Sequence, residues 1–232
     1  MSDSRARLIV ALDVSTAAAA QQIVAAVGDS ARIYKVGMQL YTAEGPQIVR
    51  DLIAAGRQVF LDLKFHDIPH TVAAAVKEAA KLGVSMLTVH AAGGTKMMRA
   101  AVDAARSTHP SMMVLGVTVL TSLDQRDLEN AGVRGTVGDQ VSRLAALAIA
   151  SGCHGVVASA QEASALRSEL GDDFLIVTPG VRPVGVSPGD QARVVTPAEA
   201  IASGASYIVV GRPITEAADP AAEAREILAQ IA

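Results

Sequence analysis

The sequence contains a single cysteine, Cys153, and no apolar run of membrane-spanning length that is free of charge and glycine. One cysteine cannot form an internal disulfide, and its setting in SGCHGVVA favours a buried structural thiol over a reactive one. The apolar run 8–14 is short, contains Asp13 and lacks the cleavage pattern of a signal peptide. We therefore expect a cytoplasmic protein with no membrane partner.

Positive charge is also scarce, because 20 lysine and arginine residues face 23 aspartate and glutamate residues, for a formal net charge of −3. A protein that binds nucleic acid usually has a basic surface, so this balance argues against a nucleic-acid partner. Any positively charged site must then be local. The 232 residues, half of them hydrophobic, suit one large core, and we expect a single domain over 1–232.

Short β-rich runs alternate with longer alanine-rich amphipathic stretches along the chain. The expected strands are 7–13, 32–37, 58–64, 85–90, 112–120, 155–159, 174–180 and 207–211. Successive βα units of this kind form parallel sheets. Eight of them predict an α/β protein with a closed (β/α)8 TIM barrel, and an open doubly wound sheet is the alternative.

Capping signals support the helices between these strands. The segment Asp13-Val-Ser-Thr can cap the stretch 16–27, and Thr196 is followed by a proline at a first-turn position and by a glutamate. Glycines stand where four helices are expected to stop, at Gly56, Gly83, Gly152 and Gly204. The long irregular regions are 121–138 and 181–195, and loops of this length often cover active sites.

Ionisable side chains gather where the expected strands end. They are Asp13, Lys35, Asp62, Lys64, His90 and Arg212. In a parallel barrel all of these ends meet at one rim, which carries the active site in TIM-barrel enzymes. Residues far apart in sequence are thus expected to converge on one mouth, where we interpret His90 as a packing residue.

The segment FLDLKFHDIPHT, residues 60–71, is the most charged of these strand ends. Asp62 and Lys64 are two positions apart, which places both side chains on one face of an extended strand. Asp67 lies in the turn beyond, where it can face the same pocket or a neighbouring subunit. Taken alone, the Asp62 and Lys64 pair would be interpreted as a surface ion pair.

Two histidines in this segment have the spacing of a helical metal site. His66 and His70 are four residues apart, but Pro69 between them breaks the helix that this spacing requires. We therefore expect no metal site there. Arg182 and Arg212 each follow a strand and a glycine, a setting that argues against a plain surface charge.

Taken together, these motifs resemble the orotidine 5'-phosphate decarboxylase family, short bacterial type, over the whole chain. The resemblance rests on D-x-K-x-x-D with Asp62, Lys64 and Asp67, then Ile68, Pro69 and Thr71; on ALDV with Asp13, YKVG with Lys35, TVLTS with Thr121, TPGVRP with Arg182, GDQ with Gln191, and VVGRPI with Gly211 and Arg212. One departure is His70, where a small polar residue such as asparagine is expected. Each motif alone is weak, but together and in family order they are specific.

This resemblance implies the decarboxylation of orotidine 5'-monophosphate (OMP) to uridine 5'-monophosphate (UMP), the last step of de novo pyrimidine synthesis, without cofactor or metal. It implies that Lys35, Asp62, Lys64 and Asp67 form an alternating charge array in which Lys64 donates the proton. The other implied substrate contacts are Asp13, Ile68, Thr71, Thr121, Ser122, Arg182, Gln191, Gly211 and Arg212. It also implies a homodimer, with Asp67 and Thr71 contributed to the partner's site.

Two other functions remain open at this stage. One is a magnesium-dependent sugar-phosphate decarboxylase or aldolase of the same barrel superfamily, in which the D-x-K-x-x-D pattern also occurs. That enzyme would give no reason for Thr121, Ser122 and the loop that carries Gln191. The other is a non-catalytic barrel that binds a phosphorylated metabolite, for which a buried charge array would be an unexplained cost.

Overall fold

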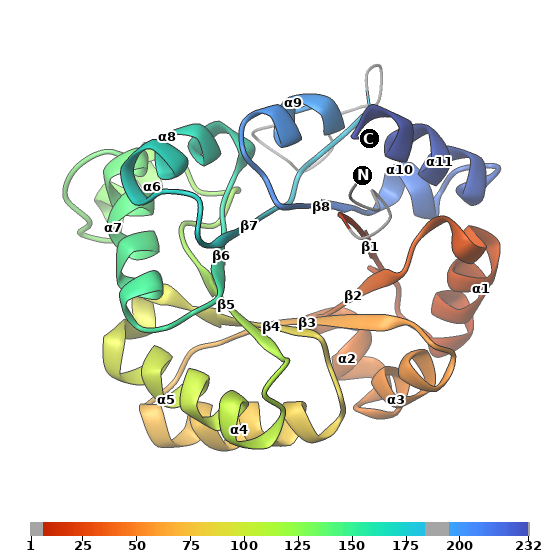
Figure 1. Ribbon diagram of the computed structural model, residues 1–232, viewed down its shortest axis with the longest axis horizontal. Coiled ribbons are helices and arrows are strands. Elements are labelled where there is room, and N and C mark those ends of the chain that lie inside the picture. Colours follow the sequence, from red (N-terminus) through yellow and green to blue (C-terminus); the bar gives the residue numbers. More distant parts are fainter. Residues whose placement is uncertain (1–6, 184–194, 232) are drawn as a thin grey trace.

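The computed structural model describes residues 7–183 and 195–231, in which eight parallel strands form a closed barrel with helices outside it (Figure 1). The strands are β1 (Leu8–Ala11), β2 (Ile33–Gly37), β3 (Gln58–Phe65), β4 (Met86–His90), β5 (Met113–Val117), β6 (Gly155–Val157), β7 (Leu175–Thr178) and β8 (Tyr207–Val210). The barrel closes where β8 pairs with β1, for example Ile208 beside Leu8. The predicted (β/α)8 barrel is confirmed, and the doubly wound alternative is wrong.

The helices follow the strands around the ring. They are α1 (Ala17–Val27), α2 (Met38–Glu44), α3 (Gln47–Ala54), α4 (Pro69–Lys81), α5 (Gly94–Thr108), α6 (Gln125–Asn130), α7 (Val137–Ala150), α8 (Ala160–Leu170), α9 (Pro197–Ala202), α10 (Arg212–Thr215) and α11 (Pro220–Gln230). The expected capping signals are confirmed. Thr16, the last residue of the segment expected to cap the first helix, accepts a hydrogen bond from the first turn of α1, and Thr196 accepts one from the first turn of α9. The expected glycine stops all have positive φ.

Several sequence-based boundaries were wrong. The first, sixth and seventh strands end at Ala11, Val157 and Thr178, each two residues before the expected end. The fifth strand ends at Val117 instead of continuing to 120, and the region 121–138 is not wholly irregular because it contains α6. Asp124 and Asp127 form a reciprocal capping box that starts this helix, a local signal that the sequence analysis missed. Most of the other expected loop, 181–195, lies outside the described residues.

Alternation along the strands produces two hydrophobic cores. One lies between the strands and the surrounding helices, and the other fills the inside of the barrel. The inner core consists of Ile9, Ala11, Ile33, Phe60, Met86, Leu115, Val177 and Val209. Because side chains alternate with a period of two, the next inward positions on β1 to β4 are Asp13, Lys35, Asp62 and Thr88. A polar layer therefore rests directly on the inner core.

Gly155 on β6 shows how closely the inner wall is packed. A Cβ atom at this position would lie 2.2 Å from the carbonyl oxygen of Leu175 and 2.6 Å from its Cβ. Both contacts are far inside van der Waals distance, and backbone cannot move aside as a flexible side chain can. Only glycine therefore allows β6 and β7 to pair at this level of the barrel.

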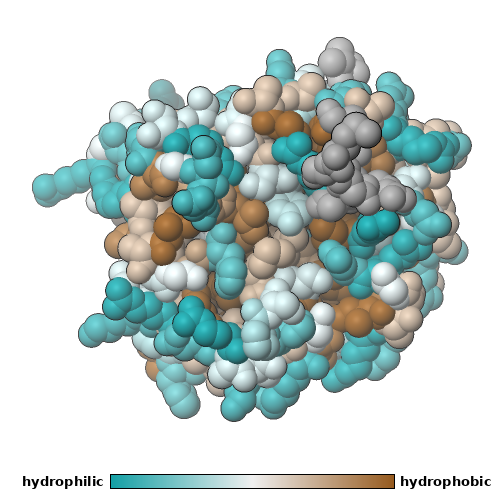
Figure 2. Space-filling view, viewed as in Figure 1, coloured by the Kyte–Doolittle hydropathy of each residue, from teal (hydrophilic) through white to brown (hydrophobic). Residues whose placement is uncertain are grey.

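Hydrophilic side chains lie on the outside of the molecule (Figure 2), and the single cysteine lies inside it. In the view down the barrel, hydrophilic side chains project around the outline of the molecule (Figure 2). Within residues 7–183 and 195–231, no helix is long and apolar enough to cross a membrane. Cys153 is buried, as predicted, and burial raises the pKa of its thiol to about 12. A thiol that resists ionisation is a poor nucleophile.

Two buried threonines allow a test of hydrogen bonding in this fold. Thr118 donates a 2.9 Å hydrogen bond to the Val157 carbonyl oxygen, whereas the Thr178 hydroxyl has no hydrogen-bond partner among the described residues. We expect Thr118→Val to lower the free energy of unfolding by about 1 kcal/mol and Thr178→Val to raise it by about as much. Urea denaturation of the two variants measures both changes, and changes of the same sign would contradict the expectation.

Candidate active site

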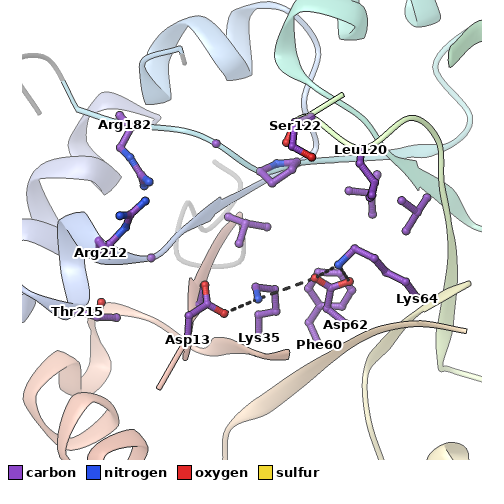
Figure 3. A pocket seen from close by; sticks show the side chains of 18 of the residues that line it. Asp13, Lys35, Phe60, Asp62, Lys64, Leu120, Ser122, Arg182, Arg212 and Thr215 are labelled. Atoms are coloured by element: carbon purple, nitrogen blue, oxygen red, sulfur yellow. Dashed lines mark hydrogen bonds and ion pairs between the residues drawn. The ribbon is translucent and has the colours of Figure 1, made fainter. Parts of the chain in front are cut away.

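A cavity of about 570 Å³ opens at the carboxyl ends of the strands (Figure 3). The predicted site residues that line it are Asp13, Lys35, Asp62, Lys64, Thr121, Ser122, Arg182, Gly211 and Arg212. Its apolar lining includes Phe60, Val119, Leu120 and Pro179. The strands thus bring together at one mouth residues from nearly the whole length of the chain, as the sequence analysis expected.

Four charged side chains form a row along one wall of this cavity. Asp13 accepts a hydrogen bond from the Lys35 ammonium at 2.8 Å, and Lys35 Nζ lies 3.9 Å from Asp62 Oδ2. Both carboxylate oxygens of Asp62 lie 2.9 Å from Lys64 Nζ. The signs alternate along the row (Figure 3), so each inner charge lies between two opposite ones.

Strand order explains why this row forms. β1, β2 and β3 are neighbours in the barrel, and each contributes the inward residue that follows its last hydrophobic layer. The side chains of Lys35 and Asp62 are only 12% and 14% exposed. Charges this little exposed to solvent need opposite partners, because desolvation would otherwise cost on the order of several kcal/mol per ion. The alternating arrangement supplies those partners before any substrate binds.

Lys64 has an unusual backbone. Its φ is 51°, which makes it the one non-glycine residue with positive φ in the described part of the chain. The register between β3 and β4 also shifts between Leu61 and Phe65, so Lys64 lies at an irregularity of the ladder. A lysine whose backbone lies in the left-handed region costs on the order of 1–3 kcal/mol, and such strain concentrates at functional sites. Sequence periodicity contained no signal for it.

Thr88 is a site residue that the sequence analysis missed. It is fully buried on β4, and its hydroxyl donates to Asp62 Oδ1 at 3.0 Å and accepts from the Lys64 backbone N–H at 2.9 Å. A signal was available, since Met86, Thr88 and His90 alternate on one face of the strand. A hydroxyl among inward-facing apolar residues needs a polar partner.

His66 and His90 form a stacked pair near Lys64. Their ring centroids are 5.2 Å apart, with an angle of 20° between the planes. Burial, together with the neighbouring His66 and Lys64, lowers the pKa of His90. His90 Nδ1 accepts a hydrogen bond from the Ala92 N–H at 3.3 Å. These contacts orient the His90 ring, and its packing role stays a prediction.

The spacing of His66 and His70 does not correspond to a helical pair. Helix α4 begins at Pro69, so His66 precedes the helix and only His70 belongs to it. Across residues 7–183 and 195–231, no group of three or more histidine, cysteine, aspartate or glutamate side chains is arranged to hold a metal ion.

The far end of the cavity contains two arginines. Arg182 is 7% exposed and follows β7, whereas Arg212 begins α10 directly after Gly211. Their guanidinium groups point toward the same space, beyond Asp13 and on the side away from Lys64 (Figure 3). Two guanidinium groups directed at one space can bind a doubly charged anion such as a phosphate.

Other predicted residues do not reach this cavity within the chain. Asp67, Ile68 and Thr71 are exposed and do not line it. The Asp67 carboxylate accepts a 2.6 Å hydrogen bond from the Ile68 N–H, just before α4. Ile68 is 65% exposed, which is unusual for a large apolar side chain. Gln191 lies outside the described residues.

A closed parallel barrel with a charged array at its carboxyl-end rim has the architecture of a TIM-barrel enzyme. The sequence profile described as "Orotidine 5'-phosphate decarboxylase / HUMPS family" matches residues 6–227. The chain belongs to this family, as the motifs indicated.

Relatives resemble the chain over almost its whole length. An orotidine 5'-phosphate decarboxylase from Hydrogenovibrio crunogenus is 50% identical over 225 residues, covering 97% of this chain and 95% of that protein. One from Anaeromyxobacter dehalogenans is 52% identical over 223 residues, covering 96% and 97%. The crystal structure of orotidine 5'-phosphate decarboxylase from Lactobacillus acidophilus superposes with a TM-score of 0.87 at 40% identity, covering 97% and 98%.

Proposed function

We propose that the protein decarboxylates OMP to UMP, the last step of de novo pyrimidine synthesis, without a cofactor and with Lys64 as the proton donor. The observation that carries the proposal is the contact of the Lys64 ammonium with both oxygens of Asp62 inside the cavity. This contact holds an ammonium group next to a carboxylate of opposite charge. The Lys64 ammonium then supplies both the electrostatic field and the proton that the reaction requires.

Electrostatic magnitudes decide which effect dominates. Two anions about 4 Å apart, such as the substrate carboxylate and Asp62, repel by about 1 kcal/mol in water and about 4 kcal/mol at an effective dielectric of 20. Enzymatic rate enhancements need ~8 to 23 kcal/mol or more. Repulsion in the ground state is therefore a secondary contribution, and stabilisation of the developing carbanion by the Lys64 ammonium is the main one.

The rest of the cavity suits the remaining parts of a nucleotide. Arg182 and Arg212 suit the phosphate because a guanidinium offers a planar pair of donors. Asp13 and Lys35, between the arginines and Lys64, suit the ribose hydroxyls (Figure 3). Thr121 and Ser122, which also line the cavity, suit the pyrimidine. Gln191 is proposed to add a neutral donor to the phosphate. Binding energy from the phosphate end can then contribute to the reaction at the other end.

The rival function is that of a magnesium-dependent sugar-phosphate decarboxylase or aldolase of the same barrel superfamily. Such an enzyme needs carboxylate oxygens that are free to coordinate the cation. Here Asp62 receives hydrogen bonds from Lys64 and Thr88 on its oxygens. This arrangement supports the lysine-based mechanism over the magnesium-based one.

We expect the purified protein to convert OMP to UMP at an undiminished rate after treatment with EDTA, because side chains supply every charge. The decrease in absorbance on addition of OMP measures the reaction. A matched sample with magnesium restored is the control. Loss of activity on chelation that magnesium reverses would support the sugar-phosphate rival instead.

We expect Arg212→Ala to raise KM for OMP by about 100-fold or more, because a charge-assisted pair of hydrogen bonds to phosphate is lost. The same variant should change the rate with orotidine, which lacks the phosphate, by less than about threefold. Steady-state kinetics with both substrates measure the difference. Equal losses with the two substrates would refute the phosphate-binding role.

The exposed residues around the start of α4 support a site shared between two chains. Asp67 and Thr71 are exposed and outside the chain's own cavity, and the large apolar side chain of Ile68 lies between them in sequence with 65% of its surface exposed. In a two-fold dimer the same surface of each chain can reach across the interface. We propose that the protein is a homodimer in which Asp67 and Thr71 complete the partner's site, while Ile68 contacts both the partner and the substrate.

We expect mixed dimers of Lys64→Ala and Asp67→Asn chains to regain activity that neither homodimer has. A mixed dimer would hold one site with both changes and one site with neither. Random exchange at equal concentrations makes half of the dimers mixed, so about a quarter of wild-type activity should return. If the chains exchange, shown by differently tagged subunits, and no activity returns, then Asp67 acts in the same chain as Lys64.

A further inference from the structure

We infer that Thr88 is a positioning residue, which holds the Lys64 backbone and the Asp62 carboxylate in their working geometry. This inference rests on the proposed function of Lys64. Thr88 lies on β4, does not line the cavity and is fully buried. It therefore acts through Lys64 and Asp62, and it has no contact of its own with a substrate in that cavity.

The hydroxyl closes a ring of hydrogen bonds. The Lys64 backbone N–H donates to Thr88 Oγ1 at 2.9 Å, Thr88 Oγ1 donates to Asp62 Oδ1 at 3.0 Å, and Lys64 Nζ donates to the same oxygen at 2.9 Å. The ring links the backbone and the ammonium of one lysine through a single carboxylate. Moving any one of the three groups disturbs the other two.

The direction of each bond in the ring is determined by chemistry. A backbone N–H can only donate, and an ionised carboxylate can only accept. Thr88 has one hydroxyl proton, so it accepts from Lys64 and gives that proton to Asp62. Serine can make the same two bonds, whereas alanine and valine can make neither. This difference separates the hydroxyl from the volume of the side chain.

The backbone of Lys64 makes the constraint necessary. A residue with a φ of 51° relaxes toward a negative φ unless surrounding contacts hold it. The ladder between β3 and β4 is interrupted between Leu61 and Phe65, so regular strand pairing does not hold Lys64. The hydroxyl of Thr88 provides a bond from β4 to the Lys64 N–H inside this interruption.

The constraint has its main effect during the reaction. When Lys64 gives a proton to the substrate, its ammonium becomes a neutral amine and attracts Asp62 less strongly. Asp62 then keeps the bond from Thr88 and its ion pair with Lys35 at 3.9 Å. An array that stays in place needs no reorganisation as charge moves, which is the basis of electrostatic preorganisation. Loss of Thr88 should therefore lower kcat more than it weakens binding.

The experiment compares Thr88→Ser, Thr88→Ala and Thr88→Val with wild type and with Thr118→Val. Thr118 is equally buried, but its hydroxyl donates its hydrogen bond to the backbone carbonyl of Val157 instead of to a member of the charge array. We measure kcat with OMP, the dissociation constant of UMP by calorimetry, and the melting temperature of each variant. The decisive comparison is between Thr88→Ser and Thr88→Ala, because it remains informative if Thr88→Val does not fold.

We expect Thr88→Ala and Thr88→Val to lower kcat by about 10- to 100-fold, the loss that corresponds to a hydrogen bond to a charged group. Their UMP dissociation constants should stay within about threefold of wild type, and Thr88→Ser and Thr118→Val should keep kcat within about threefold. The inference is overturned if alanine and serine at position 88 have the same kcat, or if kcat follows melting temperature across all four variants. A wild-type protein that leaves OMP unchanged would overturn the proposed function itself.

Discussion

The site depends on the Asp62 carboxylate, which is 14% exposed and is held by the Lys64 ammonium, the Lys35 ammonium and the Thr88 hydroxyl. Desolvation of a carboxylate this far from solvent costs free energy, and these close partners offset that cost. The partners come from β2, β3 and β4, so the ion pairs also depend on the relative positions of three strands. The geometry of the charge array therefore depends on the stability of the barrel.

The hydrophobic layers below the array provide that rigidity. The inner core fills the barrel directly beneath Lys35 and Asp62, and the outer core fixes each strand against its helices. A close-packed interior deforms little, so the charges above it are held in place without rearrangement. The strained backbone of Lys64 persists for the same reason, since the surrounding contacts outweigh its local cost.

The barrel fold by itself is compatible with many activities, because TIM barrels host unrelated chemistry on the same scaffold. The features that support a particular function are the alternating charges at one end of the cavity and the two arginines at the other. Membership of the orotidine 5'-phosphate decarboxylase / HUMPS family agrees with both features. The exposed residues around the start of α4 are the part of the motif that the cavity of one chain does not use.

The sequence by itself determined the eight βα units, the caps of α1 and α9, and the strand ends that carry Asp13, Lys35, Asp62, Lys64 and Arg212, because each of these signals is contained within a few neighbouring residues. It also contained the capping box of α6, which was overlooked. Only the tertiary structure decided that Thr88 bonds to Asp62 and Lys64, that Lys64 takes a positive φ, and that Asp67, Ile68 and Thr71 lie outside the cavity of their own chain. These features depend on the register between strands and on which side of the rim a turn faces, and no local pattern of residues specifies either.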